Sequence, residues 1–171
     1  MKAFSALLAA VILFAATAFG AETKVLVSDV HICCKSCVTG IETALKDVKG
    51  VKFAVDKDKD TVAITADEAA NAQAAVDALG GAGYYGKLDS KDVAFKAGAA
   101  PDGKVAKVEV SGIHNCCGKC TTAINKAIKA VAGVKETTAK PKLTTFEVTG
   151  DFEAKAVVKA LNDAGFQAQV K

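Results

Sequence analysis

The chain contains 171 residues, of which 51% are hydrophobic and 24% are charged, and its formal net charge is +3. This balance excludes an intrinsically disordered tail and a low-complexity linker protein. Every basic residue is a lysine, and a mild charge without arginine argues against nucleic acid as a partner. The length suits one medium-sized domain or two small ones.

Residues 1–20 have the pattern of a secretory signal peptide. Lys2 precedes an uncharged apolar run over 3–19, and small residues lead up to a cleavage site after Gly20. The alternative is an uncleaved membrane anchor, for which the run is short, because crossing a bilayer takes about 20 apolar residues. We therefore expect an exported protein, periplasmic or secreted, with no membrane span in the mature chain.

The remainder of the chain is predicted to be a tandem duplication. When Cys37 is placed over Cys120, His31 falls on His114, and Gly-Val-Lys at 50–52 falls on the same tripeptide at 133–135. The predicted boundaries are 22–90 for the first domain, 91–103 for a linker and 104–171 for the second domain. Glycine and proline within 91–103 favour a flexible linker.

Each repeat reads as strand, helix, strand, strand, helix, strand. Apolar residues at three- and four-residue spacing predict a helix over 38–48 that Gly50 ends. The other elements predicted in the first repeat are strands 25–30, 51–55, 61–65 and 84–88, and a helix from 67 to 79. Those of the second repeat are strands 105–110, 134–138, 144–149 and 166–170, and helices 121–131 and 152–164. This order predicts the α+β class, with two βαββαβ sandwiches in tandem, each a four-stranded sheet with two helices on one face.

All six cysteines and both histidines lie in two copies of the motif His-x-Cys-Cys-x-x-Cys, at 31–37 and 114–120. A Cys-x-x-Cys at a strand-to-helix junction places its two sulfurs near a helix N-terminus, which favours the thiolate. Thiolates are soft ligands that select copper(I), zinc and heavier relatives such as mercury. The candidate metal ligands are Cys33, Cys34, Cys37, His31, Cys116, Cys117, Cys120 and His114.

Three other interpretations of these motifs stay open. A structural disulfide suits an exported protein, although three cysteines per repeat leave one unpaired. A thiol–disulfide oxidoreductase would use Cys34–Cys37 and Cys117–Cys120 as redox pairs. Finally, each histidine is either a direct ligand or a buried side chain without a metal role.

Each repeat resembles a heavy-metal-associated domain, the ferredoxin-like module of copper chaperones, copper-transporting ATPases and the periplasmic mercury-binding protein. The resemblance rests on Cys34-Lys35-Ser36-Cys37 with Ile41, on Cys117-Gly118-Lys119-Cys120 with Ile124, and on Ala82-Gly83-Tyr84 and Ala164-Gly165-Phe166. It implies a metal site between the first strand and first helix, over which the Ala-Gly-aromatic segment packs.

This sequence departs from the family motif Gly-Met-x-Cys-x-x-Cys. Gly112-Ile113 and Asp29-Val30 stand where Gly-Met would, and the loop is longer, so that it gains His31 and Cys33, or His114 and Cys116. A two-thiolate site thereby becomes a three-thiolate or Cys₃His site, and the latter suits zinc.

We expect a metal-binding protein that is not an enzyme, with each domain capturing one soft metal ion at its cysteine loop. Metal would be transferred by ligand exchange with another metal carrier or with a metal-transporting membrane protein.

Overall fold

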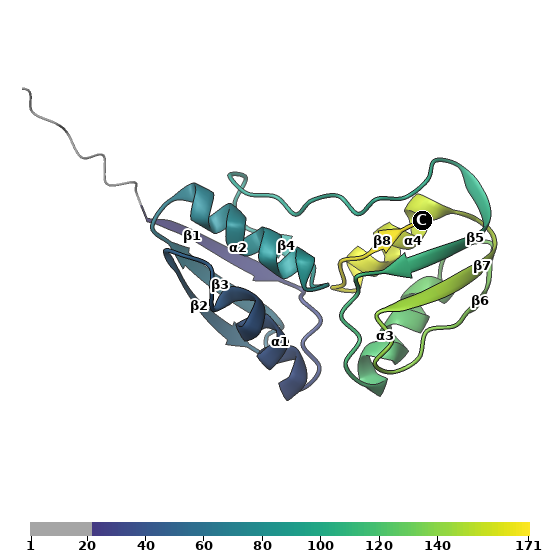
Figure 1. Ribbon diagram of the computed structural model, residues 1–171, viewed down its shortest axis with the longest axis horizontal. Coiled ribbons are helices and arrows are strands. Elements are labelled where there is room, and N and C mark those ends of the chain that lie inside the picture. The colour runs from purple at the N-terminus through teal and green to yellow at the C-terminus, as the bar shows by residue number, and fades with distance from the viewer. Residues whose placement is uncertain (1–21) are drawn as a thin grey trace, which may run out of the picture.

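The computed structural model describes residues 22–171, which form two units with the same order of elements (Figure 1). The predicted signal peptide lies outside the described residues. The first unit consists of β1 (Thr23–Ser28), α1 (Lys35–Leu45), β2 (Val51–Asp56), β3 (Thr61–Ala66), α2 (Ala69–Gly81) and β4 (Lys87–Leu88). The second consists of β5 (Lys104–Ser111), α3 (Gly118–Lys129), β6 (Val134–Thr137), β7 (Thr145–Glu153), α4 (Ala154–Asp163) and β8 (Gln169–Val170).

Each unit has a four-stranded antiparallel sheet. The strand orders are β2-β3-β1-β4 and β6-β7-β5-β8, so the first strand of each unit lies between the third and the fourth. The α+β class predicted from the sequence is confirmed. Because β1 and β5 are central strands, the loops that follow them leave the middle of each sheet, and these loops carry the cysteines.

The helices cover one face of each sheet. In β1, Val25 and Val27 are buried while Leu26 between them is 41% exposed, because successive side chains of a strand point to opposite faces. Ile41 of α1 and Leu79 of α2 are fully buried in the same core. The alternation in the strands and the apolar side of the helices therefore form one buried layer in each unit.

The last strand of each unit is shorter than predicted. Strands were expected over 84–88 and 166–170, but the structure has β4 and β8 of two residues each. The reason is that Tyr84 and Phe166 instead form an antiparallel bridge with each other, across the two units. Helix α1 begins at Lys35 and ends at Leu45 rather than at 48. Past Leu45 the chain turns more tightly, because the Val48 N–H donates to the Leu45 carbonyl three residues back, at 3.1 Å.

The connection between the units, residues 91–103, was predicted to be a flexible linker. The segment contains no helix or strand, yet both units bind it through hydrogen bonds. Gln73 of α2 donates to the Ala94 carbonyl at 2.8 Å and accepts from the Ala94 N–H at 2.9 Å. From the second unit, the Val170 N–H donates to the Ala99 carbonyl at 2.7 Å. The connection, which runs along one side of both units in Figure 1, is thus a bound strap.

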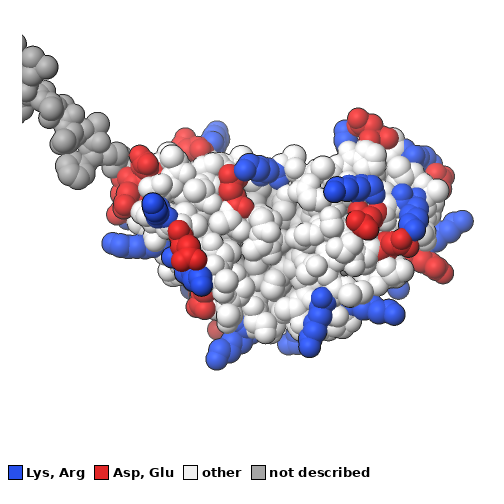
Figure 2. Space-filling model, viewed as in Figure 1, with Lys and Arg blue, Asp and Glu red and all other residues white. Residues whose placement is uncertain are grey.

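Within residues 22–171, none of the helices has the length and apolar character needed to cross a membrane. On the face drawn in Figure 2, most charged side chains lie toward the outer ends of the molecule, and the band over the junction of the units is largely uncharged.

Candidate metal centre

The two cysteine loops, residues 31–37 and 114–120, begin the first helix of each unit. Cys34 and Cys117 are the N-cap residues of α1 and α3, so Cys37 and Cys120 fall in the first helical turn. Cys37 and Cys120 are fully buried, whereas the other four cysteines are half-buried. One sulfur of each Cys-x-x-Cys therefore precedes the helix and the other lies inside its first turn, as the sequence predicted.

The loops face each other, and their thiols form one six-sulfur cluster. Across the junction, Cys33 Sγ lies 3.5 Å from Cys120 Sγ, and Cys37 Sγ lies 3.7 Å from Cys116 Sγ. Within a loop, Cys33 Sγ is 3.7 Å from Cys37 Sγ. All six cysteines are free thiols. We expected a separate site in each repeat, but the geometry joins both loops into one centre, which consists of Cys33, Cys34, Cys37, Cys116, Cys117 and Cys120.

The loops meet because each unit docks onto the other in the same way. The Gly83 carbonyl accepts from the N–H groups of His114 at 3.4 Å and Gln167 at 3.1 Å. In return, the Gly165 carbonyl accepts from the N–H groups of His31 at 3.5 Å and Tyr85 at 3.2 Å. The docking is therefore reciprocal and nearly symmetric.

Only glycine fits at the two docking positions. Gly83 has φ +84°, and a Cβ there would lie 2.2 Å from the His114 backbone nitrogen. Gly165 has φ +86°, and its Cβ would lie 2.4 Å from the His31 backbone nitrogen. A side chain at either position would strain the backbone and separate the units.

The aromatic residues after these glycines pack on the histidines of the opposite loop. Tyr84 stacks on His114 with ring centroids 4.4 Å apart, and Phe166 contacts His31 at 4.5 Å. The family resemblance implied that the Ala-Gly-aromatic segment packs over a metal loop. Here each segment packs over the histidine of the other unit's loop.

The two histidines differ in their hydrogen bonds. The Tyr84 hydroxyl donates to the Cys37 carbonyl at 2.9 Å and lies 3.1 Å from His114 Nε2. Because the one hydroxyl proton is directed at the Cys37 carbonyl, His114 Nε2 is the donor in its contact with Tyr84 Oη. His31 Nε2 is buried and has no hydrogen-bond partner among the described residues, since Phe166 has no hydroxyl to offer.

The position between the histidine and the first cysteine also differs between the loops, and sequence reasoning missed its role. Asn115 is buried, donates to the carbonyls of Lys140 at 2.8 Å and Leu143 at 2.9 Å, and accepts from Thr121 Oγ1 at 2.8 Å. The corresponding Ile32 is buried in the apolar core. The one signal in the sequence was an amide in one copy where the other has an isoleucine.

Burial makes two of the thiols weak acids. It raises the pKa of Cys33 from 9.0 to about 12, and it raises the pKa of the Cys116 thiol well above its ordinary value. Without metal, these two cysteines are therefore protonated at neutral pH.

The two N-cap thiols are stronger acids. The backbone N–H of Cys120 lowers the pKa of Cys117. Burial opposes ionisation of Cys34, but hydrogen bonds from the Cys37 N–H and the Cys116 thiol outweigh it and lower the pKa of Cys34. Cys34 and Cys117 are thus the thiols that ionise first.

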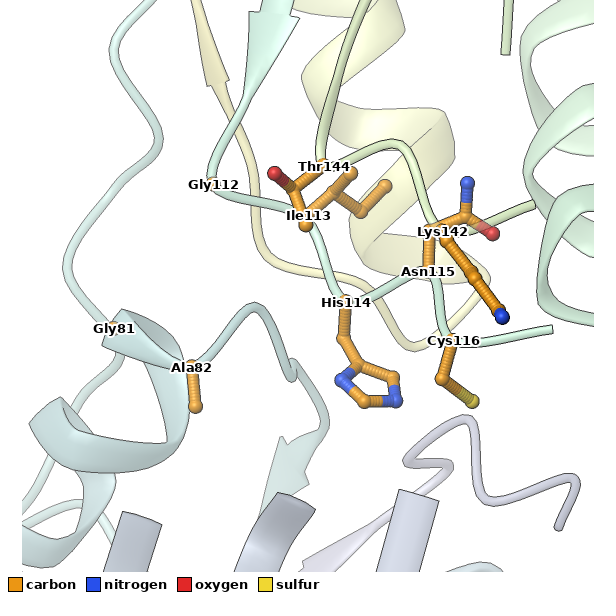
Figure 3. A pocket seen from close by; sticks show the side chains of 9 residues that line it. All are labelled: Gly81, Ala82, Gly112, Ile113, His114, Asn115, Cys116, Lys142 and Thr144. Carbon is orange, nitrogen blue, oxygen red and sulfur yellow. The ribbon is translucent and has the colours of Figure 1, made fainter. Parts of the chain in front are cut away.

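A pocket of ≈ 570 Å³ opens beside the cluster. Figure 3 shows the His114 ring and the Cys116 sulfur both directed from the second unit toward the first, with Ala82 of the first unit on the other side. Of the cluster cysteines, Cys116 is the one that lines this pocket.

Residues 107–167 match the family model described as "Heavy-metal-associated domain". A heavy-metal-associated domain is therefore present in the second unit. None of the curated proteins matches the chain.

Three solved structures show weak likeness. A copper binding domain from HMA7, a P-type ATPase, has 21% identity and a TM-score of 0.37, over 39% of this chain and 95% of that one. The N-terminal soluble domains of Bacillus subtilis CopA have 19% identity and a TM-score of 0.30, over 89% and 95%. The first two RRM domains of the yeast poly(U) binding protein Pub1 have 12% identity and a TM-score of 0.25, over 87% and 98%. At these TM-scores the likeness carries no argument about function.

Proposed function

We propose that this protein binds soft metal ions of the copper(I), zinc or mercury class, and that it captures, carries or sequesters them without being an enzyme. The observation that carries the proposal is the convergence of six free thiols from two loops, with sulfur–sulfur distances of 3.5–3.9 Å across the junction. Two thiolates bound to one ion at about 2.3 Å in tetrahedral geometry lie about 3.8 Å apart, so the sulfurs already have the spacing of a metal site.

Both units take part in this function, and we propose that the first unit is a second heavy-metal-associated domain. Its strand order equals that of the second unit, and its cysteine loop begins α1 as the other begins α3. The sharing of the centre makes the first unit as necessary as the unit that the family model matches.

Metal enters and leaves by ligand exchange in this proposal. Cys34 and Cys117 are half-buried and ionise first, so they make the first bond to an incoming ion and exchange it with the thiolate of a partner. The buried Cys37 and Cys120 then complete the coordination. The partner is another metal carrier or a metal-transporting membrane protein.

The test is to purify the protein under anaerobic, reducing conditions and to measure bound metal and free thiols before and after chelation. Copper(I), zinc or mercury that masks the thiols supports the proposal, and the double variant Cys37→Ser/Cys120→Ser loses this binding. The matched control is Ser36→Ala, an exposed position in the first loop. Metal-free protein that instead cycles a Cys34–Cys37 disulfide favours the oxidoreductase.

Export is part of the proposal and rests on the sequence of residues 1–20. Cell fractionation with N-terminal sequencing tests it. A mature chain that begins at Ala21 outside the cytoplasm supports export, and a cytoplasmic chain that retains Met1 contradicts it.

A further inference from the structure

The sulfurs of the six-sulfur cluster are arranged as four triangles that share corners. One triangle, formed by Cys37, Cys116 and Cys120, has edges of 3.7, 3.9 and 3.7 Å, and a second, formed by Cys33, Cys117 and Cys120, has edges of 3.6, 3.5 and 3.9 Å. The other two triangles join Cys33, Cys34 and Cys37, and Cys34, Cys116 and Cys117, with all sulfurs of each within 4.8 Å of one another.

Each sulfur belongs to two of these triangles. Cys33, for example, is a corner of one triangle with Cys34 and Cys37 and of another with Cys117 and Cys120. Six corners shared in this way by four triangles are the corners of an octahedron, of which the triangles are alternate faces. A metal ion at each of these faces and a bridging thiolate at each corner make a closed M₄S₆ cage.

The size of the triangles suits one ion in each. A metal ion in the plane of three sulfurs, at a bond length of about 2.3 Å, needs edges of about 4 Å. The two triangles with complete distances have edges of 3.5–3.9 Å. Three sulfurs satisfy copper(I), which is stable with three ligands, whereas zinc requires a fourth.

A histidine lies near two of the triangles. A ring nitrogen of His114 lies within 4.8 Å of the sulfurs of Cys37, Cys116 and Cys120, and one of His31 lies within that distance of Cys33 and Cys120. The described residues offer no histidine or carboxylate in the groups formed by the remaining two triangles. Filling all four faces with zinc would therefore leave two ions short of ligands.

The net charge of the filled cage also favours copper(I) over zinc. Four copper(I) ions and six thiolates carry a net charge of −2, while four zinc ions would carry +2. The N-termini of α1 and α3 both begin at cluster cysteines, and the positive end of a helix dipole stabilises an anion. Two helix N-termini therefore favour the copper(I) cage over the zinc one.

We propose that the two loops together hold one tetranuclear copper(I)–thiolate cage, rather than one metal ion each. Formation is balanced as four copper(I) ions and six thiols giving the dianionic cage and six protons, with no change of oxidation state. This inference rests on the proposed soft-metal function and specifies its metal, its stoichiometry and the sharing of one site by two units.

The experiment is a titration of the reduced, anaerobic protein with copper(I), followed by native mass spectrometry and copper X-ray absorption. The expected result is four copper ions on a single chain, with a copper–copper scattering shell. A limit below four ions, or the absence of that shell, overturns the cage while leaving metal binding intact. Failure to bind any soft metal overturns the proposed function as well.

A single substitution separates one shared cage from two independent sites. In the cage, Cys33→Ser removes a bridge between two ions, so the copper content falls below four and ions held by Cys117 and Cys120 of the other unit are also lost. With independent sites, Cys33→Ser leaves the second unit's metal unchanged. Ser36→Ala is the matched control, and Cys116→Ser repeats the test from the other loop, each variant being checked for folding by its melting curve.

Discussion

The two halves of the metal centre are close copies whose histidines are held differently. His114 stacks on Tyr84 and forms a hydrogen bond with its hydroxyl, and that hydroxyl also donates to the Cys37 carbonyl. His31 packs on Phe166 and keeps a buried nitrogen without a partner among the described residues. The two repeats thus share the shape of the site but differ in its polarity. The histidine of one half has a hydrogen-bond partner at Nε2, whereas the histidine of the other half has none among residues 22–171.

This difference bears on what each histidine does. A buried nitrogen without a hydrogen bond is costly, and a ring nitrogen of His31 lies within 4.8 Å of the sulfurs of Cys33 and Cys120. His114 has already used Nε2, so only its Nδ1 is free to bind an ion. We therefore expect His31 to respond more strongly to metal than His114.

The largest expected effect comes from the two fully buried cysteines. Cys37→Ser and Cys120→Ser should each weaken copper(I) binding by more than about 100-fold, since even loss of a hydrogen bond behind a metal ligand costs about 10–100-fold. Competition with a copper(I) chelator measures the affinity. Equal losses mean that the halves contribute equally, and an effect confined to one variant would contradict a shared centre.

The docking glycines give the next largest effect, on stability. Gly83→Ala and Gly165→Ala should each lower the free energy of unfolding by about 3 kcal/mol or more, because backbone strain adds to the loss of hydrogen bonds between the units. Gly103→Ala is the matched control, since Gly103 has φ +78° but nothing within 4 Å of its Cβ position. It should cost only about 1–2 kcal/mol. Urea unfolding measures all three, and equal costs would show that the docking adds no stability.

Removing one hydroxyl makes the two halves alike. Tyr84→Phe should cost about 1–3 kcal/mol, because it leaves a buried carbonyl and the His114 nitrogen without their partner. Tyr85→Phe is the control, because it removes the same hydroxyl group from a half-buried ring that packs on Phe95 of the strap. Thermal unfolding compares the two variants. A melting temperature of Tyr84→Phe equal to that of the unsubstituted protein would indicate that the hydroxyl contributes nothing to stability.

The last effect appears only at alkaline pH and is a pH dependence of the metal-free protein. Burial raises the pKa of Cys33 to about 12 from 9.0, so the folded state keeps a proton that the unfolded chain loses first. The contribution is complete below pH 9.0 and is lost as the pH rises toward about 12. Melting temperatures between pH 8 and 11 should therefore fall, and less steeply in Cys33→Ser. Parallel curves for the two proteins would contradict the assignment.

Much of each unit could be predicted from its own sequence. The spacing of Ile41 and Leu45 reports on contacts within one unit, and the Cys-x-x-Cys motif fixes where its sulfurs lie relative to the helix. These features depend on neighbours in the chain or on a burial pattern that repeats.

The joint centre could not be predicted, because it depends on how the two units dock. Gly83 and Gly165 were visible in both repeats, but the groups that their carbonyls accept from are backbone N–H groups of the other unit, and residue type does not identify such partners. The difference between Tyr84 and Phe166 was visible in the sequence. Its meaning was not, since the partners of the hydroxyl come from both units.

The strap between the units has a consequence for how the centre assembles. Two separate single-domain proteins would have to find each other before their sulfurs could share an ion, and their pairing would weaken with dilution. A short covalent tether raises the effective local concentration of one loop near the other to the millimolar range. Hydrogen bonds at Ala94 and Ala99 also hold the tether against both units. Metal binding by this chain should therefore be independent of the protein concentration.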